Sequence, residues 1–168
     1  MYNVKDIAFE VIKIYNSSID KIPIDKKYYI TEEKLTLLLV LIQGAYYQKY
    51  QKEAFSTPIY LSSNGSFDIY IQELKELFQP IFFVNDKNRI EFTKPFETYI
   101  PQELDEDLKD VVDTILDYYM GYEEWYIKDK IRHWESIETA IKDGSFDVKV
   151  KILGKDFRQP FITWDYIK

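Results

Sequence analysis

The stretch from Leu35 to Tyr50, LTLLLVLIQGAYYQKY, decides the fold of this chain. It holds six consecutive apolar residues, Leu37 to Ile42, so that a helix formed here would be apolar on nearly every side. Such a helix is buried among other elements. Thr31 and the two glutamates after it are the N-cap residue and first-turn acids that are typical of a helix start. The sequence therefore predicts a central buried helix over about residues 32–53, which is too short in its apolar part to span a membrane.

Composition indicates one globular domain over residues 1–168. Hydrophobic residues make up 46% of the chain and charged residues 30%, which is enough apolar side chain for a core and argues against disorder. Cysteine is absent, which excludes disulfides, thiol catalysis and cysteine-ligated metals. The first ten residues carry three charged side chains where a signal peptide would be apolar. We therefore expect a cytoplasmic protein that has no membrane span.

Four further helices are predicted around the central one from apolar residues spaced three and four apart. They cover about residues 3–16, 67–78, 104–119 and 127–141, and residues 19–29 are predicted to form an exposed loop. Gly44 interrupts the central helix, which indicates that another helix crosses closely at that point.

Two segments change from helical to alternating spacing. Residues 81–84 and 89–92 flank the polar turn Asn85 to Asn88, which predicts a β-hairpin. Apolar and polar residues alternate from Phe146 to Ile152, which predicts a half-buried strand, and the aromatic tail at residues 161–168 is expected to dock on the core. The expected fold class is mainly α, with about five helices, a small β-hairpin and a short C-terminal strand.

Motifs for catalysis are weak in this sequence. His133 is the only histidine, and a packing or surface role is the more common one for such a residue, although its imidazole is a conceivable general base. The five glycines are scattered, so no loop can cradle phosphates, and neither a Gly-x-Ser-x-Gly turn nor a calcium-binding loop is present. We expect no enzyme and no catalytic, cofactor or metal site, and an enzyme using His133 or clustered carboxylates ranks last among the hypotheses.

Negative charge is concentrated in one segment. The formal net charge is −7, and between Pro101 and Glu124 nine acids stand against the single base Lys109, so the rest of the chain is nearly neutral. Acids recur three and four residues apart on one side of the helix predicted for this segment; they are Glu103, Glu106, Asp110, Asp113 and Asp117. Such a face repels phosphates, so direct nucleic-acid binding is not expected, whereas a basic partner protein would be attracted.

Two interpretations of this face remain open. It is either a plain solvated helix side, with Lys128 and Arg132 neutralising part of it, or a docking surface extended by the aromatic residues that follow. These aromatics are more often core or helix-junction residues. The predicted partner-binding residues are Glu106, Asp110, Asp113, Asp117, Tyr118, Tyr122, Trp125 and Tyr126.

Several segments resemble the Panacea domain, also called DUF4065, a SocA-like family of bacteria and their phages. They are VKDIA at 4–8, IT at 30–31, LTLLLVLIQGAYY at 35–47, residues 104–119, Trp134 and ITWDYI at 162–167. After the central helix this chain has TPIYLS at 57–62 where the family has a Gly-Pro-Val stretch. The resemblance implies a mainly helical, non-enzymatic module that binds other proteins, as an antitoxin, a toxin neutraliser or a proteolytic adaptor.

Two functions follow as hypotheses. The first is an antitoxin-like neutraliser or adaptor that binds a basic partner protein through the acidic helix. The alternative is a phage-encoded anti-defence inhibitor, similar in kind to an anti-CRISPR protein, whose carboxylates mimic nucleic-acid phosphates.

Overall fold

The computed structural model describes residues 1–18, 30–62, 68–71, 73–74, 82–84, 90–92 and 99–157, with the backbone alone for 82–84 and 90–92. In these residues the chain is mainly helical, as the sequence predicts. The helices are α1 (Val4–Ser18), α2 (Glu32–Tyr50), α4 (Glu106–Tyr119), α5 (Glu124–Ile131), α6 (Glu135–Lys142) and α7 (Val150–Asp156). Two small antiparallel sheets accompany them, one of β1 (Tyr60–Leu61) with β2 (Ile69–Tyr70) and one of β3 (Phe82–Val84) with β4 (Ile90–Phe92).

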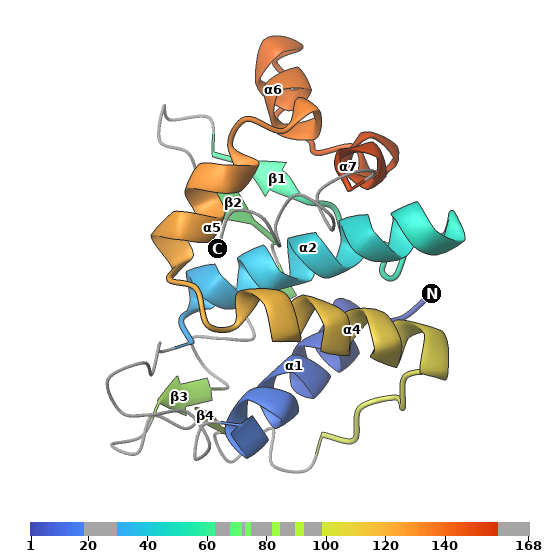
Figure 1. Ribbon diagram of the computed structural model, residues 1–168, viewed down its shortest axis with the longest axis vertical. Helices are drawn as coiled ribbons and strands as arrows, with labels where there is room; N and C mark the ends of the chain where they lie inside the picture. Colours follow the sequence, from blue (N-terminus) through green and yellow to red (C-terminus); the bar gives the residue numbers. More distant parts are fainter. Residues whose placement is uncertain are drawn as a thin grey trace.

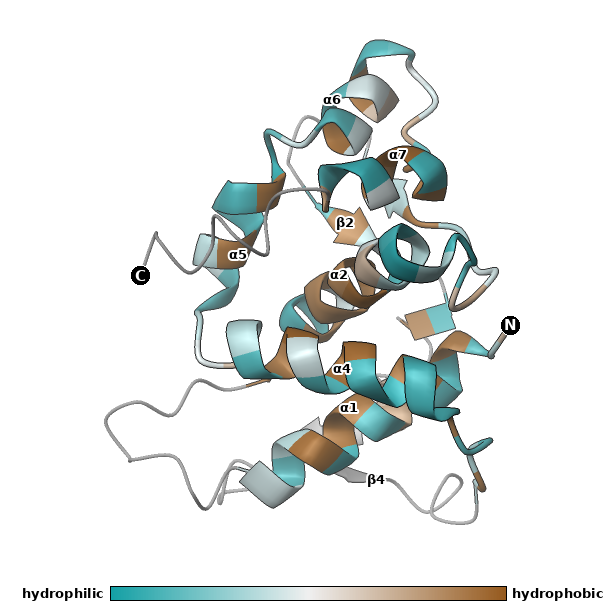
Figure 2. Cartoon of the chain, turned by 45° about the vertical axis from the view of Figure 1, so that its right-hand side comes forward, coloured by the Kyte–Doolittle hydropathy of each residue, from teal (hydrophilic) through white to brown (hydrophobic). Residues whose placement is uncertain are grey.

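Helix α2 occupies the centre of the molecule, and this prediction is confirmed. The Thr31 hydroxyl caps it by accepting a hydrogen bond from the backbone N–H of Lys34 at 3.1 Å. Every residue from Lys34 to Tyr46 is buried, because α1, α4, α5, α7 and β2 all pack against α2. Figure 1 shows α2 running through the middle of these elements, and Figure 2 shows its hydrophobic middle turns.

Gly44 marks a close helix crossing, as predicted. Helix α7 lies so near that a Cβ atom at Gly44 would stand 2.7 Å from Cδ2 of Phe157 and 2.9 Å from Cγ of Leu153. Gly154 of α7 approaches from the other side, and a Cβ there would lie 2.7 Å from Cδ1 of Tyr47. The two glycines therefore leave the space into which the side chains of the facing helix pack, and this allows α2 and α7 to cross closely.

The predicted strand over residues 146–152 is wrong. Only Asp147 makes a bridge, to Tyr60, and the backbone N–H of Val148 donates to the carbonyl of Ile59 at 2.9 Å. From Val150 the chain turns into α7. We attribute this change to the crossing with α2, because a helix brings Leu153, Gly154 and Phe157 together against Gly44 and an extended strand would not.

Two predicted helices also need correction. Ile69 and Tyr70, expected inside a helix over 67–78, form β2 instead and pair with β1, where the Tyr60 and Tyr70 rings lie 5.7 Å apart. Residues 73–74 are helical, and the remainder of that prediction falls outside the described residues.

The helix predicted over 127–141 is divided into α5 and α6. The Asp156 carboxylate caps the start of α6 by accepting from the backbone N–H groups of Glu135 at 3.0 Å and Ser136 at 3.2 Å. This cap lies 21 residues away from Glu135 in the sequence, so no local pattern reveals it.

The β3–β4 hairpin is confirmed, with Phe82 paired to Phe92 and Val84 to Ile90. The loop predicted at 19–29 and the docking of the 161–168 tail concern residues that the structure does not describe. In the part of the chain that it does describe, none of the helices combines the length and the apolar character needed to cross a bilayer.

Candidate partner-binding site

Helix α4 presents its carboxylates to solvent as the spacing predicts. Its buried residues, Leu108, Val111, Val112, Ile115, Leu116 and Tyr119, form the side that packs against the core. The exposed side carries Glu106, Asp110, Asp113 and Asp117, which we call the acidic face. Glu103 was expected on the same helix side, but the helix begins only at Glu106 with Asp105 as its N-cap, so that part of the prediction is wrong.

The acidic face is only partly neutralised by the chain itself. Asp110 accepts from Nζ of Lys49 at 2.9 Å, and both side chains are at least half exposed. Among the residues that the structure describes, no cation lies within ion-pair distance of Glu106, Asp113 or Asp117. Lys128 was a candidate to neutralise this face, but it pairs with Glu33 and Asp68 instead. Of the four carboxylates of the acidic face, three therefore have no ion-pair partner in the described part of the chain.

The predicted aromatic residues lie around the junction of α4 and α5, and we call Tyr118, Tyr122, Trp125 and Tyr126 the aromatic corner. The rings of Tyr122 and Tyr126 stack with centroids 4.7 Å apart, and Trp125 meets Tyr126 edge-on at 5.9 Å. The three tyrosines are half-buried against the core, whereas Trp125 is 63% exposed. Its indole N–H donates to the carboxylate of Glu123. The tyrosines therefore act as helix-junction residues, and Trp125 is the side chain that reaches solvent.

Sequence reasoning missed a buried lysine under this corner. Lys34, in the first turn of α2, is only 1% exposed, and its Nζ donates to the backbone carbonyl of Met120 at 2.6 Å. Burial lowers the pKa of Lys34 to about 8, and the carboxylates of Glu124 and Glu123 oppose that shift. The lysine thus ties the start of α2 to the end of α4.

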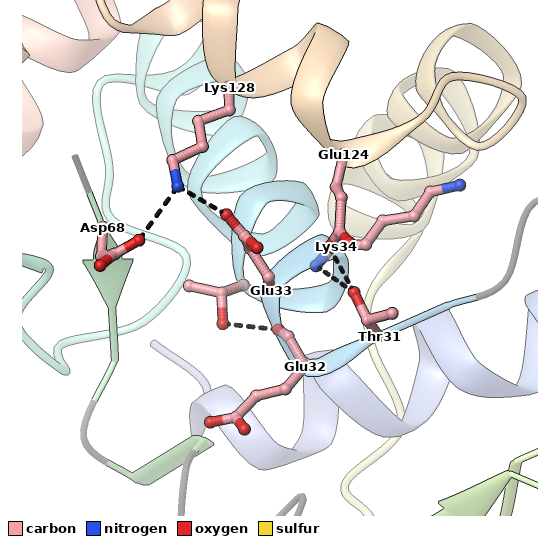
Figure 3. A network of polar contacts seen from close by, with 8 residues as sticks. Thr31, Glu32, Glu33, Lys34, Asp68, Glu124 and Lys128 are labelled. Carbon is pink, nitrogen blue, oxygen red and sulfur yellow. Dashed lines mark hydrogen bonds and ion pairs between the residues drawn. The ribbon is translucent and has the colours of Figure 1, made fainter. Parts of the chain in front are cut away.

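Two further contacts hold α5 against the start of α2, as Figure 3 shows. The Thr31 hydroxyl donates to Oε2 of Glu124 at 2.5 Å. Nζ of Lys128 reaches Glu33 at 2.9 Å and Asp68 at 3.0 Å. Burial alone would lower the pKa of Lys128, but its hydrogen bonds to these two acids outweigh burial and raise the pKa. The helix that carries Trp125 is therefore fixed to the core by side chains at its first and second turns.

These contacts predict the effect of replacing Thr31. Thr31→Ala removes both the cap on Lys34 N–H and the hydrogen bond to Glu124, so we expect the free energy of unfolding to fall by about 1–2 kcal/mol in urea denaturation. Thr31→Ser retains the hydroxyl and is the matched control, expected to stay close to the wild type. Equal losses in the two variants would show that the methyl group, and not the hydroxyl, matters.

A cavity of about 490 Å³ opens beside this network, and its lining includes the acids Glu32, Glu33, Asp68 and Glu124. Elsewhere His133 lies exposed between α5 and α6. Within the described ranges, no three histidine, aspartate or glutamate side chains are grouped so that they could hold a metal ion.

Comparison with protein-family models, curated proteins and solved structures gives no match to this chain. The resemblance to the Panacea domain therefore stays a prediction.

Proposed function

We propose that this chain is a non-enzymatic protein-binding module that holds a basic partner protein against the acidic face and the aromatic corner. In this proposal it acts in the cytoplasm as an antitoxin-like neutraliser or an adaptor. The observation that carries the proposal is the set of exposed carboxylates on α4, Glu106, Asp113 and Asp117, together with a Trp125 side chain on the following helix that is 63% exposed.

The position of these acids supports a role in binding. Asp117 lies in the last turn of α4, where the helix dipole disfavours negative charge, and Asp113 is its neighbour at i−4. Like charges at this spacing cost about 0.2–0.5 kcal/mol per pair, so the acids bring no stability to the isolated helix. A basic partner would relieve that repulsion.

The two parts of the surface would serve different steps of binding. Exposed charges accelerate encounter with a partner of opposite sign, whereas a few buried aromatic residues supply most of the affinity. Figure 1 shows the end of α4 leading into α5, so Asp117 in the last turn of α4 and Trp125 in the first turn of α5 lie on consecutive helix ends. Because α2 fixes both helices, the surface is already formed before binding, which lowers the entropy lost on association.

The charge contribution can be tested on the partner that co-purifies with the wild-type chain from native cells. We expect Asp113→Lys with Asp117→Lys to slow association by about tenfold at low salt, because steering by charge is lost. The matched control is Glu135→Lys with Glu138→Lys, which makes the same charge change at two exposed sites on α6. Equal association rates in the two double variants, or rates independent of salt, would contradict the proposal.

The contribution of Trp125 to affinity is measured by the rate at which the complex dissociates, apart from the contribution of charge to the association rate. Trp125→Ala should accelerate dissociation by about tenfold or more, as loss of a central aromatic contact does. Ile141→Ala, which truncates a half-exposed apolar residue on α6, is the control and should leave dissociation unchanged. A DNA oligonucleotide that displaces the chain from its partner would favour the phosphate-mimicking inhibitor over the neutraliser.

A further inference from the structure

A groove between α2 and α4 crosses the acidic face at Asp110. It has a volume of about 220 Å³ and is lined by Ala45, Gln48, Lys49, Asp110, Val111 and Thr114. We propose that this groove receives an arginine side chain of the basic partner, and that Lys49 is a built-in competitor which occupies Asp110 until the partner arrives. This inference depends on the proposed function and adds to it the chemistry of one anchor residue.

The lining of the groove suits a guanidinium group. Ala45 and Val111 are buried residues that provide an apolar floor, against which the methylene stem and the flat face of an arginine can lie. Gln48 and Thr114 are half-buried polar residues at the same groove. Asp110 supplies the charge, and a carboxylate can accept two parallel hydrogen bonds from the forked guanidinium. A lysine offers only a point charge and cannot make that paired contact.

The internal ion pair is built so that it can be displaced. Nζ of Lys49 lies 2.9 Å from Oδ2 of Asp110, and the side chains of the pair are 50% and 64% exposed. Exposed single-bond pairs of this kind contribute little stability, because water competes for both partners. The Lys49 ammonium also lies 5.2 Å from the centroid of the Tyr50 ring. This cation–π contact can still hold the ammonium after an arginine of the partner has bound Asp110. An arriving guanidinium would therefore replace a weak contact by a stronger one.

The test uses N-acetyl-arginine methylamide as the probe and follows the backbone amide signals of Ala45 and Thr114 by NMR. We expect saturable shifts at these amides in the wild type and about two- to fivefold tighter binding in Lys49→Met, since the competitor is gone. Lys109→Met is the matched control. Lys109 is a lysine of α4 that is likewise paired to a carboxylate, Glu103 at 2.9 Å, but it lies outside the groove. Asp110→Asn should abolish the shifts, and the uncharged N-acetyl-citrulline methylamide should give none.

Several outcomes would overturn the inference: no saturable shifts at Ala45 and Thr114, equal tightening in Lys49→Met and Lys109→Met, or binding that survives in Asp110→Asn. These failures are distinguishable from failure of the proposed function, which is tested with a protein partner and with variants at Asp113, Asp117 and Trp125. If those variants impair partner binding while the groove shows no preference for arginine, the acidic face binds the partner without this anchor.

Discussion

Replacing Gly44 by alanine is expected to lower the free energy of unfolding by about 2 kcal/mol, although alanine is the better helix former by about 1 kcal/mol. The new methyl group would stand 2.7 Å from Cδ2 of Phe157 and 2.9 Å from Cγ of Leu153, well inside van der Waals contact. Both neighbours are buried, and Phe157 is further held by an edge-on contact with Trp134 at 5.0 Å. Since neither side chain can swing into solvent, α7 has to move away from α2.

Urea denaturation checks this expectation, and Gly121→Ala is its control. Gly121 follows α4, and a Cβ there would meet no atom within 4 Å, so that variant should keep wild-type stability or gain a little. In the Gly44→Ala background, Phe157→Ala should cost clearly less than its usual effect of about 3–5 kcal/mol, because the smaller side chain relieves the clash. If the two substitutions simply add, or if Gly44→Ala is neutral, the helices do not meet as closely as the structure shows.

The Gly44 crossing shows what a local sequence pattern can predict and what it cannot. A glycine in the middle of an otherwise strong helix indicates that something approaches closely, but it does not say what. The approaching helix was itself predicted as a strand, because residues 146–152 alternate in polarity. The position of α7 depends on a contact between segments about a hundred residues apart, which no window of the sequence contains. The same limitation explains the single helix predicted over 127–141, where the cap that starts α6 comes from Asp156.

The candidate site, too, could be predicted from the sequence only in part. Spacing alone was enough to place Glu106, Asp110, Asp113 and Asp117 on one exposed helix side. It could not show that Lys49, 61 residues away from Asp110, would pair with it. Lys34 was the harder case, because a lysine in the first turn of a helix normally points to solvent. The signal that was available is that Lys34 directly precedes the apolar run of a helix expected to be buried, although Glu33 beside it is exposed.

Replacing Lys34 by methionine is expected to change how stability depends on pH. The folded-state pKa of Lys34 is about 8, lowered by burial, whereas an unfolded chain has the ordinary value of about 10.4. Below pH 8 both states are protonated, and the penalty of the buried charge is fully present. Between about pH 8 and 10.4 the unfolded state binds the additional proton. The free energy of unfolding of the wild type should therefore rise with pH, relative to Lys34→Met, by about 1 kcal/mol per pH unit.

Urea denaturation of both proteins at pH 7.5, 8.5 and 9.5 measures this difference below the range in which ordinary tyrosines ionise, near pH 10. The total across the whole window is of order 3 kcal/mol, one of the largest single effects expected in this chain. Lys128→Met is the control of opposite sign, since the pKa of Lys128 is raised and any stability that it adds is lost only at higher pH. Parallel curves for the wild type and Lys34→Met would mean that Lys34 is not buried as a charged group. A difference that grows with pH would establish that Lys34 has a lowered pKa in the folded state, as expected for an ammonium buried at the junction of α2 and α4.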